Sequence, residues 1–249
     1  MRFSGKVAII TGAGQGIGAA YAQALAQEGA SIVIAEIDRI NGQQAAEEIC
    51  QSGYAAIFIE TDIASETSCA AMAKKAVDTF GGIDFLINNA SIFSGKRKEG
   101  LLTVDYDYYL RFMEVNMHGQ LLVARAVYGE MSKRGGGVII NQSSAAAWSA
   151  GDFYSVSKAA TNAITVSLAR EMGPLNIRVN AIAPGPIDTP ATRGTVSAER
   201  IKEIRDSLPL ARLGSLDDVV NLCLFLLSGE ASWITGQIIG VDGGSVVRL

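Results

Sequence analysis

Short apolar runs, rich in Val and Ile and bounded by Gly, Asn or Asp, alternate along this chain with longer segments of helical periodicity. Such alternation is typical of βαβ units. Apolar residues fill nearly every position of each run, so helices are expected to cover both faces of the sheet. The predicted strands are 7–11, 32–36, 56–60, 85–88, 138–142, 178–182 and 238–241.

Helices are expected at 17–29, 41–52, 66–80, 106–132, 153–173 and 216–228, with Ser65 and Ser215 as N-caps of two of them. The sequence thus predicts an α/β fold, a single doubly wound parallel sheet of about seven strands with a Rossmann-like arrangement and the first strand in its centre. No linker, repeat or low-complexity tract interrupts residues 1–249, so one domain is expected. The segment from Pro184 to about Arg212 is the least regular and is predicted to act as a mobile lid.

Composition excludes several classes of function. With 21 basic and 25 acidic side chains, the formal charge is −4, so the chain lacks the basic surface that nucleic acid binding needs. The densest apolar stretch, 222–227, is too short for a membrane span or a signal h-region, so no membrane partner is expected. Three cysteines without CxxC spacing and a single histidine favour a reducing, cytoplasmic compartment and no metal site.

A glycine-rich turn follows the first predicted strand and leads into an alanine-rich helix. It reads Thr11-Gly12-Ala13-Gly14-Gln15-Gly16-Ile17-Gly18. A diphosphate can approach a helix N-terminus only where no Cβ blocks the backbone, and the free N–H groups and helix dipole attract it. Gly12, Gly16 and Gly18 meet this requirement and predict a dinucleotide site, with an ordinary strand-to-helix turn as the alternative.

An acidic residue, Glu36, ends the second predicted strand, about 20 residues beyond the turn. Its carboxylate can accept hydrogen bonds from the adenosine ribose of NAD and would repel the additional phosphate of NADP. Asp38 competes for this role, and its alternative is a helix cap. Gln15 offers no positive charge to a 2′-phosphate, so both observations favour NAD.

Further motifs follow in order: Asp62-Ile63, Asn88-Asn89-Ala90, Asn116, Ser143-Ser144, Tyr154-x-x-x-Lys158 and Pro184-Gly185-x-Ile187-x-Thr189. With the glycine turn, this ordered set resembles the short-chain dehydrogenase/reductase family over nearly the whole chain. The resemblance implies that Asp62 contacts the adenine amino group and that Pro184 to Thr189 brace the nicotinamide carboxamide and the diphosphate. It also implies a homotetramer assembled through the helices at 106–132 and 153–173 and the C-terminal segment.

Residues and resemblance together predict an NAD-dependent oxidoreductase acting on a small-molecule alcohol or ketone. The expected cofactor contacts are Gly12, Gln15, Gly16, Ile17, Gly18, Glu36, Asp62, Ile63, Asn89, Ala90, Tyr154, Lys158, Pro184, Gly185, Ile187 and Thr189. The expected catalytic residues are Asn116, Ser144, Tyr154 and Lys158, and Ser144, Trp148 and Tyr154 are expected to contact the substrate.

Tyr154 and Lys158 are four residues apart on a predicted helix, so their side chains share one face. Lowering the pKa of a tyrosine from about 10 to near 7 requires about 4 kcal/mol of preferential phenolate stabilisation. The ammonium of Lys158 and a positive nicotinamide are expected to supply it, which makes Tyr154 a general acid/base. Ser144, preferred to Ser143 by the local match over 139–144, would donate to the substrate oxygen. By resemblance, Asn116 maintains a helix bend and anchors a water that connects Lys158 to solvent.

Two features depart from the family pattern. Ser91 takes the place of the usual glycine after Asn-Asn-Ala, which predicts a narrower pocket or a slightly different turn, and the interval from the serine pair to Tyr154 is shorter than usual. Four apolar residues flank the motifs and form either a substrate wall, favouring a hydrophobic or cyclic secondary alcohol, or part of the core: Ile92, Phe93, Trp148 and Phe153.

Other readings of the sequence stay open. The run Lys96-Arg97-Lys98 is either a solvated surface or a site for an anionic substrate. His118, in the middle of a predicted helix, suits a structural role, and without a G-x-S-x-G elbow a Ser-His-Asp hydrolase is disfavoured. An NADP-dependent 3-oxoacyl-thioester reductase and a non-catalytic dinucleotide-binding regulator are the alternative functions. Glu36 argues against the first, and the intact Tyr154 and Lys158 argue against the second.

Overall fold

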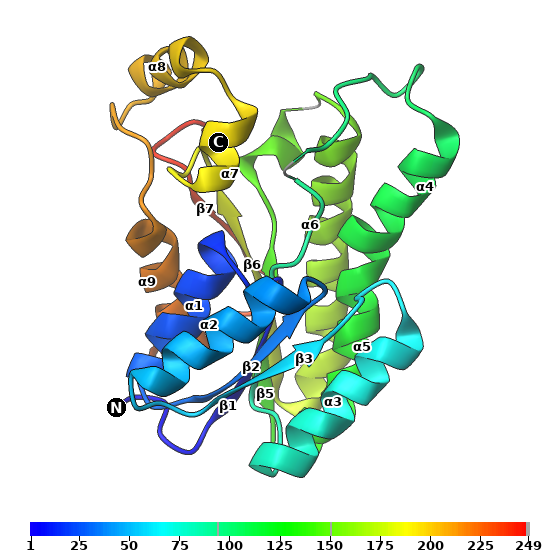
Figure 1. The fold of residues 1–249 in the computed structure, drawn as a ribbon, viewed down its shortest axis with the longest axis vertical. Coiled ribbons are helices and arrows are strands. Elements are labelled where there is room, and N and C mark those ends of the chain that lie inside the picture. The colour runs from blue at the N-terminus through cyan, green and yellow to red at the C-terminus, as the bar shows by residue number, and fades with distance from the viewer. Residues whose placement is uncertain (94, 150, 248–249) are drawn as a thin grey trace.

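A computed structural model describes residues 1–93, 95–149 and 151–247 (Figure 1). Its strands are β1 (Val7–Thr11), β2 (Ser31–Glu36), β3 (Ala56–Glu60), β4 (Phe85–Asn88), β5 (Gly137–Gln142), β6 (Ile177–Pro184) and β7 (Ile238–Val241). They form one parallel sheet in the order β3-β2-β1-β4-β5-β6-β7. The predicted α/β class and all seven strands are confirmed.

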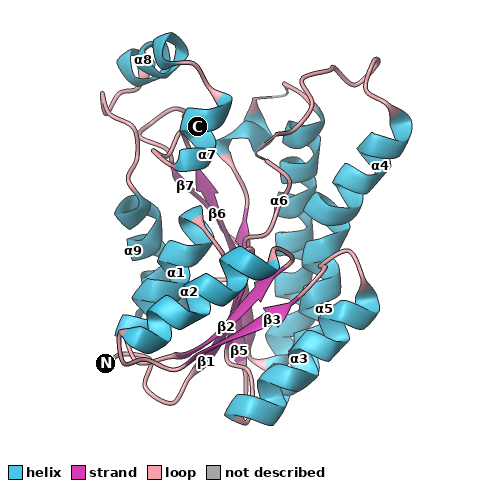
Figure 2. Cartoon of the chain, viewed as in Figure 1, coloured by secondary structure: helices cyan, strands magenta, loops and turns pink. Residues whose placement is uncertain are grey.

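Helices cover both faces of this sheet (Figures 1 and 2). On one face lie α1 (Gly16–Gln27), α2 (Arg39–Gln51) and α9 (Leu216–Leu227). On the other lie α3 (Glu66–Phe80), α5 (Gly119–Lys133) and α6 (Phe153–Met172). The remaining helices are α4 (Tyr106–Met113), α7 (Pro190–Thr195) and α8 (Ala198–Ser207), the π-helix η1 (Glu114–His118) and the 3₁₀ segments η2 (Ala145–Trp148), η3 (Gly173–Leu175) and η4 (Gly229–Ala231).

The sequence of β1 explains why helices cover both faces. All five of its residues are buried; Ala8 and Ile10 pack on the α1 and α9 side, whereas Val7 and Ile9 pack on the α3 and α5 side. Successive side chains point to opposite faces of the sheet, so a strand that is buried along its whole length must be covered on both faces. β1 is third in the sheet and β4 holds the middle place, one position away from the central location expected for the first strand. The direction of chain progression reverses between β1 and β4, where ligand crevices of such sheets form.

The helix predicted at 106–132 is not continuous. The π-helix η1 separates α4 from α5 and contains Asn116, which is fully buried. Its Nδ2 donates to the carbonyl oxygen of Ile92 at 3.0 Å, and its Oδ1 accepts from the Ile92 N–H at 2.7 Å. Side-chain bonds to a distant loop are invisible to helical periodicity, and π-turns of this kind are frequent at functional sites. Asn116 thus lies in a π-helix that interrupts the helix, at the point where a bend was expected.

The segment 184–212 is more regular than the sequence predicted. It contains α7 and α8, whose N-caps Thr189 and Ser197 accept hydrogen bonds from the N–H groups of Thr192 and Arg200. α8 is short and has no buried residue, and its two isoleucines, Ile201 and Ile204, stand among charged side chains, so its apolar periodicity is weak. The prediction of an irregular segment is wrong for this reason, and its role as a lid stays a prediction.

Two other helix starts follow the sequence closely. Ser65 caps α3 by accepting from the Ser68 N–H, and Ser215 caps α9 in a reciprocal capping box with Asp218. Within the described ranges, no helix has both the length and the apolar character needed to cross a membrane.

Candidate active site

A cavity of about 580 Å³ lies at the carboxyl ends of the strands and is formed by the turns that follow them. Its volume is typical of sites for small molecules and cofactors. Most residues predicted from the sequence line it: Gly12, Gln15, Gly16, Ile17, Glu36, Asp62, Ile63, Asn89, Ala90, Ser144, Tyr154, Lys158, Pro184, Gly185, Ile187 and Thr189. Gly18, Asn116 and Trp148 are not among its lining residues.

The glycine turn has the backbone that a diphosphate requires. Gly12 and Gly16 have φ values of +64° and +59°, a region that side chains other than hydrogen disfavour. A Cβ on Gly16 would meet nothing within 4 Å, so the backbone is open at this point. The N-cap residue of α1, Gln15, makes no side-chain bond to the first-turn N–H groups, which have no acceptor within the helix. The turn therefore fits an anionic dinucleotide, as the sequence predicts.

Gly18 and Asn89 pack against this turn and hold its backbone in place. A Cβ on Gly18 would lie 2.2 Å from the carbonyl oxygen of Gly12 and 2.5 Å from Nδ2 of Asn89. That Nδ2 donates to the carbonyl oxygens of Thr11 and Gly12 at 3.0 and 2.9 Å. The Thr11 hydroxyl in turn accepts from the N–H groups of Asn89 and Ala90, both at 3.0 Å. Gly18 thus permits helix, strand and loop to meet closely, although it is not exposed to the cavity.

Glu36 and Asp38 have separate roles. The Glu36 carboxylate lines the cavity and accepts from the N–H groups of Gly14, Ile37 and Asp38 at 3.1, 2.9 and 3.1 Å. Asp38 caps α2 by accepting from two N–H groups of its first turn. The cap interpretation of Asp38 is therefore confirmed, and contact of Glu36 with a ribose stays a prediction.

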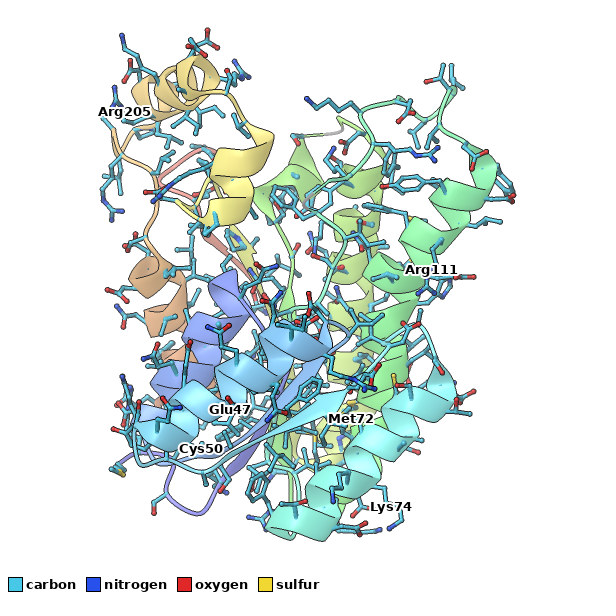
Figure 3. The ribbon with its side chains drawn as sticks, viewed as in Figure 1. Glu47, Cys50, Met72, Lys74, Arg111 and Arg205 are labelled. Carbon is cyan, nitrogen blue, oxygen red and sulfur yellow. The ribbon has the colours of Figure 1, made fainter. Side chains whose placement is uncertain are left out.

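Asp62 forms an ion pair that the sequence did not predict. Its Oδ2 lies 3.1 Å from Nη2 of Arg111, and its Oδ1 accepts from the Ala64 N–H at 2.9 Å. Arg111 comes from α4 (Figure 3), lines the cavity and is also paired with Glu114. No motif includes Arg111, and its partner lies 49 positions away, so only the folded chain reveals it.

Tyr154, Lys158 and Ser144 meet at the opposite end of the cavity. Lys158 is 1% exposed, and its Nζ donates to the carbonyl oxygen of Gln142 at 2.8 Å. The same Nζ lies 5.5 Å from the centre of the Tyr154 ring, which packs against Phe93. Ser144 is the N-cap of η2, and its hydroxyl interacts with the phenol. These contacts confirm that the helical spacing of Tyr154 and Lys158 brings them to one site.

Burial shifts the pKa of both Tyr154 and Lys158. Burial raises the pKa of Tyr154 to about 12, an effect opposed by the Ser144 hydroxyl and reinforced by the charge of Asp152. Burial also lowers the pKa of Lys158 to about 8. The buried amine of Lys158 is directed at a carbonyl oxygen, so the lowering of the phenol pKa that we expect from Lys158 together with a positive nicotinamide stays a prediction.

The serine pair is divided between two roles. Ser143 donates to Oδ1 of Asn162 at 2.6 Å and is directed away from the phenol, whereas Ser144 interacts with it. The geometry favours Ser144, the residue chosen from the local match. Ser91 also lines the cavity, and its φ lies outside the left-handed region, so the turn accepts serine without backbone strain.

The apolar residues that flank the motifs are also divided. Ile92 and Phe93 line the cavity, but Phe153 is fully buried in a cluster with Phe112 and Met113, so its core interpretation is confirmed. Trp148 lies on η2 outside the cavity lining, and its contact with substrate stays a prediction.

The segment after β6 forms one wall of the cavity. A Cβ on Gly185 would lie 2.7 Å from Cα of Asp242, so the close approach of these two chains requires glycine. Ile187 is held by a bridge to Gly214, and Thr189 caps α7. The basic run in the loop before α4 does not line the cavity; Lys96 is paired with Asp152, and the guanidinium of Arg97 lies 4.5 Å from the ring centre of Tyr108.

A parallel sheet with a phosphate-binding glycine turn, an acidic residue ending β2, and a Ser-Tyr-Lys cluster in the same cavity defines a dinucleotide-dependent oxidoreductase. A family model described as enoyl-(acyl carrier protein) reductase matches residues 12–246. The chain belongs to the short-chain dehydrogenase/reductase family.

Relatives with this fold match over nearly their full length. An uncharacterized oxidoreductase of Mycobacterium tuberculosis is 54% identical over 246 residues, covering 99% of both chains. The 7α-hydroxysteroid dehydrogenase of Escherichia coli is 38% identical and covers 100% of this chain and 97% of its own. A structure of a 7α-hydroxysteroid dehydrogenase with NADH and 7-oxo glycochenodeoxycholic acid matches with a TM-score of 0.93 at 38% identity, covering 100% and 97% of the two chains. A short-chain type dehydrogenase/reductase of Mycobacterium marinum matches with a TM-score of 0.91 at 32% identity, covering 99% and 97%.

Proposed function

We propose that this protein is an NAD-dependent dehydrogenase that interconverts a hydrophobic or cyclic secondary alcohol and its ketone. The observation that carries the proposal is the placement of Tyr154, Ser144 and Lys158 in the same cavity as the glycine turn and Glu36. One end of the cavity suits an adenosine diphosphate, and the other suits proton transfer to an oxygen.

Each end of the cavity has a distinct part in the reaction. The first turn of α1 holds the diphosphate, Glu36 accepts from the adenosine ribose, and Pro184 to Thr189 surround the nicotinamide. The bound cofactor supplies hydride acceptance and donation. Tyr154 removes the hydroxyl proton of the alcohol, and in the reverse direction it protonates the oxygen of the reduced ketone. Ser144 donates to that oxygen, and Lys158 orients the nicotinamide ribose.

Charge and lining support both the cofactor and the substrate class. The Glu36 carboxylate lines the cavity and would repel the additional phosphate of NADP, and the related 7α-hydroxysteroid dehydrogenase is described with NADH. The cavity wall near Tyr154 includes the apolar side chains Ile92 and Phe93, with Val196 and Ile204 contributed by the segment after β6. An apolar wall favours a hydrophobic substrate, and the steroid substrate of that relative supports a cyclic one.

The test combines binding with turnover. The rates of NAD reduction by wild type and by Tyr154→Phe are measured with cyclic and with aliphatic secondary alcohols as substrates. Tyr54→Phe, at a tyrosine outside the cavity lining, is the matched control. We expect Tyr154→Phe to lose at least about 100-fold in kcat, since a general acid/base typically contributes that much, with NADH affinity retained. Equal rates for wild type and Tyr154→Phe would refute the proposed chemistry.

A second candidate is an NADP-dependent 3-oxoacyl-thioester reductase, because the matching family model is described by an acyl carrier protein substrate. Fluorescence titration with NADH and NADPH separates the two candidates. Tighter binding of NADPH, together with reduction of a 3-oxoacyl thioester, would replace the alcohol dehydrogenase assignment.

The proposal also covers the domain organisation, the oligomeric state and the cellular location of the protein. We expect residues 1–249 to act as one NAD(P)-binding dehydrogenase domain, in a cytoplasmic homotetramer built through α4, α5, α6 and the C-terminal segment. Light scattering on the purified chain measures the assembly, and a monomeric mass would contradict this expectation.

A further inference from the structure

Lys96 makes contacts that a solvated surface lysine would not make. It lies in the loop between β4 and α4, yet its side chain is only 17% exposed. The ammonium is paired with Oδ2 of Asp152 and lies 5.7 Å from the ring centre of Phe153. Lys96 therefore connects this loop to the first residues of α6, the helix that carries Tyr154 and Lys158.

The Asp152 carboxylate divides its two oxygens between two partners. Oδ1 caps α6 by accepting from the Ser155 N–H at 3.0 Å, while Oδ2 is left for Lys96. Burial opposes its ionisation, but the hydrogen bonds from Lys96 and from the helix N-terminus hold the pKa of Asp152 below its ordinary value. A fixed negative charge thus lies two residues before Tyr154.

That charge acts on the phenol. After burial, which is the largest cause, and against the hydroxyl of Ser144, the charge of Asp152 raises the pKa of Tyr154. Lys158 lies near the Tyr154 ring, and the Ser144 hydroxyl interacts with the phenol. Tyr108 and Tyr109 pack, like Tyr154, against the cluster of Phe112 and Phe153, and the guanidinium of Arg97 lies over Tyr108. Lys96 is the cation in direct contact with Asp152.

The same loop also forms the wall beside the phenol. Ile92 is held at both its N–H and its carbonyl group by Asn116, and Phe93 lies 5.4 Å from the Tyr154 ring, centre to centre. The ion pair attaches the loop a few residues further along. Lys96 therefore joins the loop that carries Ile92 and Phe93 to the residue that caps the helix of Tyr154.

We infer that the Lys96–Asp152 ion pair is a positioning device for Tyr154, in which Lys96 pairs with the carboxylate that caps the helix of Tyr154 and ties to it the loop carrying Ile92 and Phe93. Neither residue touches the reacting atoms; both act through Tyr154. This inference rests on the proposed function, because it assigns a purpose to the acidity of Tyr154.

The test is a double-mutant cycle on Lys96 and Asp152, in which the pH profile of kcat/KM for alcohol oxidation is measured for each variant. The variants are Lys96→Gln, Asp152→Ser, which retains a capping side chain, and the double variant. Lys98→Gln is the matched control, since Lys98 is an exposed lysine of the same loop. Ultraviolet difference titration of each variant, with and without Tyr154→Phe, follows the same phenol in the absence of substrate and cofactor.

Alcohol oxidation needs the ionised phenol of Tyr154, so the midpoint of the pH profile of kcat/KM follows the pKa of that phenol. Lys96→Gln leaves the carboxylate uncompensated and should move the midpoint up by about 0.5 to 1 pH unit, while Asp152→Ser should move it down by a similar amount. The double variant should return close to wild type, and Lys98→Gln should not move it. In the difference titration the same order of midpoints is expected.

The outcomes separate two kinds of failure. If Tyr154→Phe is inactive but Lys96→Gln and Asp152→Ser share the wild-type midpoint, the pairing inference is refuted and the proposed function stands. If both single variants lose activity without any movement of the midpoint, the pair is merely structural and the inference is also refuted. If Tyr154→Phe is fully active, the proposed function itself fails.

Discussion

Replacing Lys158 by Met should make this protein more stable at neutral pH. The amine is 1% exposed, and burial lowers its pKa from the ordinary 10.5 to about 8. At about 1.4 kcal/mol for each pH unit, the folded state is penalised by about 3 kcal/mol for keeping this charge. Losing the bond to the Gln142 carbonyl costs about 1 kcal/mol, which leaves a net gain of about 2 kcal/mol for Lys158→Met.

The gain must depend on pH in a defined direction. Below pH 8 both the folded and the unfolded chain carry the proton, so the penalty is present in full. Between about 8 and 10.5 only the unfolded chain retains it, and stability of the wild type rises with pH. The advantage of Lys158→Met should therefore be greatest near pH 7 and should be close to zero by about pH 9.5.

Thermal and denaturant unfolding at fixed protein concentration measure this difference. For a chain of this length, about 2 kcal/mol corresponds to an increase in Tm of about 4 to 8 °C at pH 7. Lys75→Met, at an exposed position on α3, is the matched control and should change Tm little. A Lys158→Met protein that is less stable at pH 7, or equally favoured at pH 7 and pH 9.5, would refute the reasoning.

Three other substitutions test separate parts of the structure. Glu36→Ser removes the carboxylate that we expect to repel a 2′-phosphate and should lower the preference for NADH over NADPH at least about 10-fold, as measured by fluorescence titration. Gly18→Ala places a Cβ 2.2 Å from a carbonyl oxygen and should lower the free energy of unfolding by at least about 2 kcal/mol. The control is Gly129→Ala, in the helix α5, where a Cβ meets nothing within 4 Å and should raise the free energy of unfolding by about 0.5 to 1 kcal/mol. Denaturant unfolding measures both. Tyr21→Phe leaves Oε1 of Gln142 without its 2.8 Å hydrogen bond inside the protein and should cost about 1 to 3 kcal/mol by the same measurement, and a wild-type value would show that this bond contributes nothing.

Local chemistry explains which features were predictable. The strands were recognised because their residues are apolar at successive positions, and the start of α3 because Ser65 can accept from the N–H groups of the next turn. The glycine turn was recognised because a backbone with positive φ and no Cβ suits a diphosphate, and Gly12 and Gly16 have that conformation. In each case the physical cause acts within a few residues of chain.

Features that depend on distant partners were missed. α8 was missed because it is short, mostly charged and without a buried residue. A bend was expected at Asn116, but the π-helix there and the hydrogen bonds of Asn116 to Ile92, 24 positions away, were not. The raised pKa of Tyr154 follows from burial on all sides, which the spacing to Lys158 cannot express.

From the sequence alone come the alternation of strands and helices, the dinucleotide turn and the order of the Ser, Tyr and Lys residues, because each depends on short-range periodicity, backbone freedom or spacing along one helix. Only the tertiary structure brings Lys96 to Asp152 and Arg111 to Asp62, across 56 and 49 positions. The paths of the loops around the packed sheet decide which of these charged residues come into contact. The electrostatic environment of the site depends on those contacts, because charge interactions depend on distance in space and not on separation along the chain.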